Sequence, residues 1–252
     1  MKVTLPSCCG LLLLLGACTD KKDEFVPETP AAYVQLAPGK YITYLLDSTV
    51  FVQSGRVQEN HRYQEKHTVD AQVTDALSRP SWRIFRSLRD SAGTRAWEPA
   101  GTYLVTLTNG TLERIEDNMR TVRLATPVTA GTSWKGHRFL ATEPYTLLYN
   151  FSNDDAPGFG DWDFTIASSG ESVAIRGQVY ENVATVNGVD ESLNVPITIP
   201  TSFGYRSFLT EQWARGVGMI YQNYILWEYQ PNPNGTPYRI GFGVERSIID
   251  HN

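Results

Sequence analysis

The sequence GVGMIYQNYILWEYQ (216–230) is followed by the turn sequence PNPNGTP (231–237) and then by YRIGFGVERSIID (238–250). Apolar residues alternate with other residues in these runs, most clearly after the turn, which is the pattern of strands with one buried face. Proline, asparagine and glycine mark the connection between the runs as a loop. The stretch therefore predicts a long β-hairpin in which 219–229 pairs with 238–249.

Glycines interrupt this predicted hairpin at Gly216, Gly218, Gly241 and Gly243. Glycine inside a strand often marks a bulge or strong curvature. A curved sheet needs such relief points along its strands. We therefore expect the hairpin to belong to a curved sheet, such as a half-barrel or an incomplete barrel.

The rest of the chain repeats the pattern of short alternating runs separated by turn signals, and helical periodicity is weak throughout. No run of alternating strand and helix units is present, which favours antiparallel pairing. The predicted fold class is all-β: a single curved antiparallel sheet, half-barrel or incomplete barrel, with at most one short helix. The further runs are YTLLYNF (145–151), WDFTI (162–166) and NVPITI (194–199), and the further turn signals are SG (54–55), NG (109–110), SG (169–170) and NG (187–188).

The N-terminus has the features of a lipoprotein signal peptide. Lys2 precedes a short apolar run (8–17), which is too short to span a membrane as a helix. Its end, LGAC (15–18), resembles the lipobox of bacterial lipoproteins. In that family the cysteine becomes the first residue after cleavage, carries a diacylglycerol on its sulfur, and is usually acylated on its amine (palmitoylation). The resemblance implies lipid attachment at Cys18; an ordinary secretory signal that contains a cysteine is the alternative.

The expected organisation is a signal peptide (1–17), an acylated cysteine with a flexible tether (18–30), and an antiparallel β domain (31–252). The tether is charged and contains proline, so it cannot bury enough apolar area to fold alone. Its KKDE segment (21–24) resembles the export signal of surface-exposed lipoproteins in Bacteroidetes-type bacteria. An unspecialised polar tether explains the same residues.

Two C-terminal segments, EQWARGVGMIYQNYILWEYQP (211–231) and GFGVERSIIDHN (241–252), resemble an uncharacterised family of Bacteroidetes-type outer-membrane lipoproteins. LAPGKYITYLLDSTVF (36–51) is similar to the first strands of that family. The resemblance implies an outer-membrane lipoprotein with a β-rich fold, with periplasmic and surface-exposed orientations both open. It supplies no catalytic residues.

The composition of the chain excludes some classes of binding partner. The formal net charge is −5 and no basic stripe is present, so nucleic acid is not an expected partner. Apart from the N-terminal run, no apolar segment is long enough to span a membrane. Two of the three cysteines belong to the predicted signal peptide, so the mature chain has no second thiol for a disulfide, a metal or a nucleophile.

The loop NDDAPGFGDWD (153–163) is a weak calcium candidate. Asp154, Asp155, Asp161 and Asp163 offer four carboxylates, and Ca²⁺ binds six to eight oxygen ligands. The loop lacks the spacing of the helix–loop–helix calcium motif. A solvated turn between two strands is the favoured interpretation, and we expect no cofactor.

The four histidines do not form a predicted site. His61 and His67 lie on one face of a predicted strand but about 20 Å apart at roughly 3.3 Å per residue, too far to share a metal. His137 and His251 stand alone.

No serine lies in a nucleophile elbow and no glycine-rich phosphate loop is present. The tryptophans are expected to fill the core rather than a site, since aromatic side chains dominate core burial; they are Trp82, Trp97, Trp134, Trp162, Trp213 and Trp227.

The sequence thus predicts a membrane-anchored envelope lipoprotein with a non-catalytic, ligand- or partner-binding role. The ligand class stays open among an apolar molecule, a glycan and a protein. The first alternative is a lipid or lipoprotein carrier that holds an acyl chain on the concave side of the sheet. The second is a hydrolase acting on an extracellular polymer, and the third a structural or adhesive protein with an exposed flat patch.

Overall fold

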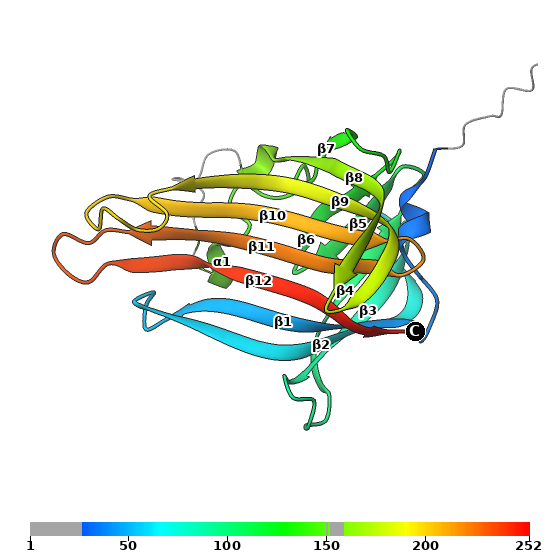
Figure 1. Cartoon of the computed structure of the whole chain (residues 1–252), viewed down its shortest axis with the longest axis horizontal. Helices are drawn as coiled ribbons and strands as arrows, with labels where there is room; N and C mark the ends of the chain where they lie inside the picture. The colour runs from blue at the N-terminus through cyan, green and yellow to red at the C-terminus, as the bar shows by residue number, and fades with distance from the viewer. Residues whose placement is uncertain (1–26, 150, 152–158) are drawn as a thin grey trace, which may run out of the picture.

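Twelve antiparallel strands form one sheet in the computed structural model of the chain, which describes residues 27–149, 151 and 159–252 (Figure 1). The order across the sheet is β6-β5-β4-β3-β2-β1-β12-β11-β10-β9-β8-β7. The strands are β1 (Tyr41–Val52), β2 (Val57–Thr74), β3 (Pro80–Asp90), β4 (Glu98–Leu107), β5 (Thr111–Glu116), β6 (Met119–Ala125), β7 (Ser133–Lys135), β8 (Asp163–Ile175), β9 (Gln178–Leu193), β10 (Gly204–Ala214), β11 (Gly218–Gln230) and β12 (Tyr238–His251).

The first and last strands pair in the middle of this order. β1 pairs with β2 on one side and with β12 on the other, from Ile42 opposite His251 to Thr49 opposite Gly243. Each half of the chain is therefore a meander of neighbouring strands, β1–β6 and β7–β12, and the two meanders join through the chain's two ends.

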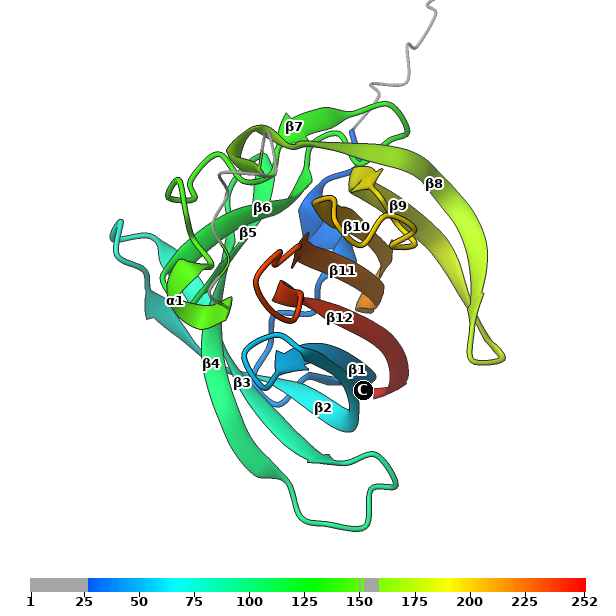
Figure 2. The ribbon, with the colours of Figure 1, turned by 90° about the vertical axis from the view of Figure 1, so that its left-hand side faces the viewer.

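The sheet curls until its two edges touch, as Figure 2 shows. The backbone N–H of Val122 on β6 donates to the carbonyl of Gly136, which directly follows β7. The indole N–H of Trp134 on β7 donates back to the carbonyl of Val122 over 2.9 Å. These contacts bring together the two edges that an open sheet would leave unpaired. The prediction of a half-barrel or incomplete barrel is confirmed.

Helical structure in the described residues is limited to one turn of α-helix and two short 3₁₀ segments. They are α1 (Thr146–Tyr149), η1 (Pro30–Tyr33) and η2 (Phe159–Asp161). This agrees with the expectation of at most one short helix.

The predicted C-terminal hairpin is confirmed as β11 and β12, with Gln230 opposite Tyr238 beside the turn. Gly241 occupies a place where only glycine fits. Its φ is +102°, and an added Cβ would lie 2.1 Å from the carbonyl oxygen of Leu226. Gly218, with φ +132°, lies beside a register shift between β10 and β11. Both glycines are relief points of the kind the sequence predicts.

The prediction of a strand at 145–151 is wrong, because Thr146–Tyr149 form α1. The backbone N–H of Tyr149 donates to the carbonyl of Tyr145, closing one helical turn. Both tyrosine rings contact Phe242, at centroid distances of 5.2 and 4.3 Å. A separation of four residues places two side chains on one face in a helix as well as in a strand, so the alternation was ambiguous.

The prediction of a strand at 194–199 is also wrong, since β9 ends at Leu193 and a loop follows. Asn194 organises this loop: its carboxamide oxygen accepts hydrogen bonds from the N–H groups of Thr198 and Ile199. Pro196 has no N–H to offer a neighbouring strand. Local side-chain hydrogen bonds thus replace strand pairing here.

Two predicted turns lie inside strands instead. Gly170 falls within β8, where φ is +79° and the register with β9 shifts. Gly188 falls within β9, and the pairing with β10 passes from Val189 directly to Asn187. The glycines mark bulges, which is the other structural meaning of glycine in a strand. The turns at 54–55, 109–110 and 231–237 are confirmed.

Candidate functional site

The predicted lipid attachment site and half of the calcium candidate lie outside the described residues: Cys18, Asp154 and Asp155. Asp161 ends η2 and Asp163 begins β8. Lys135 lies between them, with its ammonium 2.6 Å from the carbonyl oxygen of Asp161 and 3.1 Å from a carboxylate oxygen of Asp163. A cation of the chain itself therefore lies where a metal would compete for the same oxygens.

The described part of the chain contains no group of three or more His, Cys, Asp or Glu side chains that could hold a metal ion. His61 is partly exposed and contacts Glu59, whereas His67 is buried inside the sheet. Trp134, Trp162 and Trp213 are buried, as expected of core residues, whereas Trp82, Trp97 and Trp227 are only partly buried and lie outside the core.

Several charged side chains line the lumen, which we define as the space enclosed by the curled sheet. Strand alternation places Arg246 on the same face of β12 as Phe242 and Ile248, both buried. On β5 the same rule turns Arg114 and Glu116 inward. Buried charges must be paired or hydrogen-bonded, so each of these groups needs a partner inside the lumen. We call the charged set the lumen cluster: Glu65, Arg86, Arg114, Glu116, Arg123, Glu211 and Arg246.

Glu65 on β2 is the centre of one part of this cluster, with 2 % of its surface exposed. One of its oxygens accepts a hydrogen bond from Nε of Arg246 over 2.6 Å. The same oxygen lies 3.2 Å from Nε2 of His67, and the other lies 3.7 Å from Nε of Arg86. Arg246 also donates to the side-chain oxygen of Gln222.

Gln222 links this part to a second buried carboxylate, Glu211, which is fully buried on β10. The amide nitrogen of Gln222 donates to one oxygen of Glu211 over 2.6 Å, and the indole of Trp213 donates to the other over 3.1 Å. Arg123 on β6 forms an ion pair with Glu211 from across the lumen. The network therefore joins strands from both halves of the chain.

Glu116 is the third ion-paired carboxylate of the cluster. It lies 2.5 Å from Nη1 of Arg86 and 2.6 Å from Nη2 of Arg114. The guanidinium of Arg114 also stacks on the ring of Tyr103 at 4.1 Å. The hydroxyl of Tyr103 contacts Nδ1 of His67 over 3.0 Å. Arg114 is thus held on two sides.

The electrostatics of the cluster keep Glu65 and Glu116 ionised. Burial alone would raise the pKa of Glu65, but the charges and hydrogen bonds of Arg246 and His67 together outweigh it and hold that pKa well below its ordinary value. Glu116 follows the same rule: burial opposes ionisation, and Arg114 and Arg86 lower its pKa. Burial lowers the pKa of His67.

Arg123 is in the opposite situation. Burial and the neighbouring Arg114 lower its pKa to about 10. At neutral pH it stays protonated, and its positive charge lies beside a second positive charge. Glu211, paired with Arg123, and Glu116, paired with Arg114, offset part of this repulsion.

Two cavities lie within the lumen, and Arg114 and Arg123 line both of them. The apolar cavity, of about 100 Å³, is bounded by Ile42, Tyr44 and Val105 among others. The polar cavity, of about 130 Å³, is lined by the four arginines of the lumen cluster, by Glu116 and Asp117, by aromatic residues, and by α1.

The polar cavity opens to solvent between α1 and the β5–β6 turn. Leu148 and Tyr149 of α1 line it and are 50 % and 40 % exposed. Asp117, in the turn, is exposed as well. Tyr145 and Tyr224 form its inner wall, where the hydroxyl of Tyr224 donates to that of Tyr145.

The lumen is a poor container for an acyl chain. Cavities that hold whole small-molecule ligands measure about 300–1,000 Å³, and the apolar cavity is far smaller. Tyr44, Tyr224 and Trp213 occupy the concave side together with the buried charges. This filling argues against the carrier alternative.

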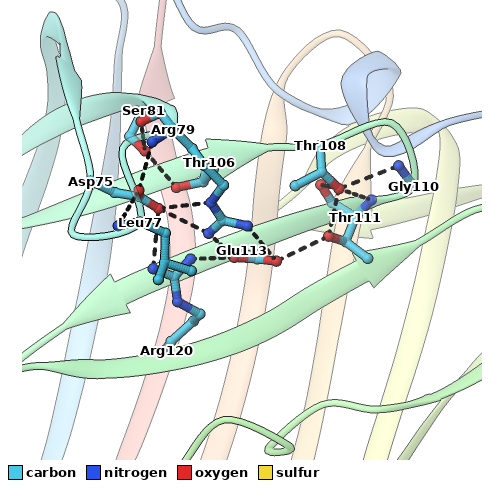
Figure 3. Close-up of polar contacts among 10 residues, drawn as sticks. All are labelled: Asp75, Leu77, Arg79, Ser81, Thr106, Thr108, Gly110, Thr111, Glu113 and Arg120. Carbon is cyan, nitrogen blue, oxygen red and sulfur yellow. Dashed lines mark hydrogen bonds and ion pairs between the residues drawn. The ribbon is translucent and has the colours of Figure 1, made fainter.

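Figure 3 shows a second ionic network, which is separate from the lumen cluster. Glu113 precedes Arg114 in β5, so the two side chains point to opposite faces. Arg79 donates to Glu113 over 2.6 Å and to Asp75 over 2.9 Å, and Arg120 contacts the same two acids over 2.5 and 3.1 Å. We call Asp75, Arg79, Glu113 and Arg120 the outer cluster. It ties the β2–β3 turn to β5 and β6.

The lumen cluster was not predicted from the sequence, although one signal for it was present. The apolar alternation that assigns Phe242 to a buried face places Arg246 on that face too. Glu65 and His67 are likewise in phase with buried Val69. A charged residue in phase with buried apolar residues indicates a buried ion pair, but sequence alone does not identify its partner.

Comparison with known proteins gives little guidance. No protein-family model and no curated protein matches the chain. One solved structure, a Bacteroides fragilis protein described as exported and as having a YmcC-like fold, aligns with 11 % identity over 86 % of this chain and 99 % of that chain, with a TM-score of 0.36. A TM-score of this size does not define a shared fold, so the fold assignment rests on the strand pairing itself.

Proposed function

We propose that this protein is an outer-membrane lipoprotein, anchored through acylated Cys18, that binds a small ligand in the lumen of its half-barrel and is not an enzyme. The observation that carries the proposal is the solvent-open polar cavity lined by Arg86, Arg114, Arg123 and Arg246. Fold-stabilising ion pairs alone do not require an open cavity among them.

The non-catalytic part of the proposal is supported by the state of the lumen acids. A general acid at neutral pH needs a raised pKa. The pKa values of Glu65 and Glu116 are lowered instead, because arginine guanidinium groups neutralise them. These carboxylates are therefore suited to holding arginines in place rather than to donating protons to a glycosidic bond.

The anchoring part is supported by the sequence at 15–18 and by the charged segment that follows it. In the part of the chain that the structure describes, no helix is long and apolar enough to cross a membrane. Two or three acyl chains, at about 0.8 kcal/mol per buried methylene, exceed what stable anchoring requires.

Membrane fractionation of the Cys18→Ala variant tests the anchor. We expect the variant to be released in soluble form or to remain unprocessed, while the wild-type chain fractionates with the outer membrane. A variant that still fractionated as an integral lipoprotein would contradict the proposed anchor.

Native mass spectrometry of the full chain, purified gently in a mild non-ionic detergent, tests ligand binding. We expect a reproducible extra mass of small-ligand size beyond that of the acylated polypeptide. The Arg114→Gln variant should lose this mass and the outer-cluster variant Arg120→Gln should keep it. A bare acylated mass for the wild-type protein, even after incubation with cell extract, would count against a ligand-binding role.

A further inference from the structure

The polar cavity has more positive than negative charge around it. Four guanidinium groups line it, against the carboxylates of Glu116 and of Asp117 at its exposed mouth. Behind this lining lie Glu65, already engaged by Arg246, and Glu211, engaged by Gln222, Trp213 and Arg123.

One further buried acid, Glu228, lies on the same face of β11 but at a distance. It is six residues from Gln222, about 20 Å along a strand at roughly 3.3 Å per residue. It does not line the polar cavity. Counting Glu116, Glu65 and Glu211, the four guanidinium groups keep an excess of one positive charge inside the lumen, which Asp117 at the exposed mouth balances.

Two guanidinium nitrogens around the polar cavity, Nε of Arg86 and Nε of Arg114, are buried and form no hydrogen bond among the described residues. Nε of Arg86 lies 3.7 Å from a carboxylate oxygen of Glu65, beyond hydrogen-bond distance. A guanidinium offers five N–H donors, and burying one without an acceptor costs free energy. An incoming acceptor with two or more oxygens would satisfy them.

The arginines are also held in position before any ligand arrives. Tyr103 supports one face of the Arg114 guanidinium, and Glu116 fixes both Arg114 and Arg86. Arg86 additionally donates to the carbonyl of Ala100. A site that is ordered in advance binds more tightly because less conformational entropy is lost on binding.

Size and access restrict the ligand further. A cavity of about 130 Å³ holds an oxyanion but not a whole drug-sized molecule, which needs about 300–1,000 Å³. The mouth beside Leu148 and Tyr149 leaves room for the remainder of the ligand outside. The tyrosines of the wall, Tyr145 and Tyr224, provide hydroxyl groups next to the arginines.

We propose that the polar cavity binds an oxyanion, a carboxylate or a phosphate, that forms one end of a small organic ligand. This inference rests on the proposed function, since it names the chemistry of the ligand for the same cavity. Arginine pairs with carboxylate and phosphate through parallel charge-assisted hydrogen bonds, which makes these two groups the natural occupants.

Isothermal titration calorimetry on the full chain in mild detergent tests the proposal with three probes. Sodium phosphate and methyl β-D-glucuronide supply the two oxyanions, and methyl β-D-glucoside supplies the same sugar ring without charge. Ionic strength is held constant with sodium chloride so that screening does not imitate binding. The variants are Arg114→Gln and Arg86→Gln in the cavity, with Arg120→Gln in the outer cluster as the matched control.

We expect at least one anionic probe to bind the wild-type protein and the glucoside not to bind. Each cavity variant should weaken that binding about tenfold or more, because a charge-assisted pair is lost, while Arg120→Gln should leave it unchanged. If Arg114→Gln fails to fold, Arg86→Gln, at the partly exposed rim, gives the same test. Tighter binding of phosphate would indicate a phosphate group on the ligand, and tighter binding of glucuronide would indicate a carboxylate.

Two results would overturn the inference. One is the absence of binding by both anions at millimolar concentration. The other is equal binding of glucoside and glucuronide with no loss in the cavity variants. If native mass spectrometry still found a bound ligand in either case, the proposed ligand-binding function would stand, and only the inference that the ligand carries an oxyanion would be wrong.

Discussion

The outer cluster and the lumen cluster are both built from arginines and acids on neighbouring strands, yet their charge balance differs. The outer cluster has two arginines and two carboxylates, and both arginines contact both acids. The lumen cluster has four arginines and three carboxylates and borders an open cavity. A balanced network holds strands together. A network with an excess of one charge beside a cavity can also attract a ligand.

The largest expected effect is in the lumen. Arg246→Met leaves the carboxylate of Glu65 buried without its main partner, and breaking a buried ion pair in this way costs about 3–5 kcal/mol. Urea unfolding followed by tryptophan fluorescence measures the loss. The double variant Glu65→Gln with Arg246→Met should recover much of it, because no unpaired charge remains. A loss below about 1 kcal/mol for the single variant would show that Glu65 is not held by Arg246.

Acidification should also lower the free energy of unfolding through its effect on the lumen cluster. The loss should be smaller than that of Arg246→Met, because protonation removes the buried negative charge of Glu65. The folded-state pKa of Glu65 is depressed below its ordinary value of 4.5. A group of this kind stabilises the fold above pH 4.5 and loses that contribution as the pH falls below it. The Glu65→Gln variant should lose less stability between pH 5 and pH 3 than the wild-type protein does. An identical slope for both proteins would contradict the assignment.

The outer cluster should respond less to loss of one arginine. Arg79→Met leaves Arg120 in contact with both Asp75 and Glu113, so we expect a loss of about 1–2 kcal/mol in unfolding free energy. Ligand binding, measured with the oxyanion probes, should not change. A loss as large as that of Arg246→Met would erase the distinction between the two clusters.

The smallest effect is expected at an exposed pair. Arg62 on β2 forms two hydrogen bonds with Asp47 on β1, and both side chains are substantially exposed. Solvent and salt screen such pairs. Asp47→Asn should therefore leave the melting temperature within the error of differential scanning calorimetry. A clear decrease in the melting temperature would mean that solvent exposure does not determine how much an ion pair in this sheet contributes to stability.

Much of the fold was predictable because strand pairing follows local patterns. The β11–β12 hairpin and its relief points at Gly218 and Gly241 were read from alternation and glycine placement. The errors at 145–151 and 194–199 have a common cause. Alternation over six or seven residues cannot distinguish a strand from a turn of helix that contacts Phe242, or from a loop organised by Asn194.

The site was less predictable because it depends on distances across the lumen. Arg246 could be assigned to a buried face, but its partner Glu65 lies 181 residues earlier in the chain. Arg123 and Glu211 meet only because the sheet curls until its edges touch. No local pattern encodes that closure. The calcium candidate, by contrast, relied on a local cluster of carboxylates, and its described members share their surroundings with Lys135.

The most direct test of the central claim is an NMR titration of arginine Nε–H resonances in the full chain in detergent, with phosphate or methyl β-D-glucuronide added at constant ionic strength. We expect the resonances of Arg114 and Arg86 to shift and saturate, while those of Arg79 and Arg120 stay unchanged. Lumen resonances that do not move, or lumen and outer resonances that move alike, would contradict it.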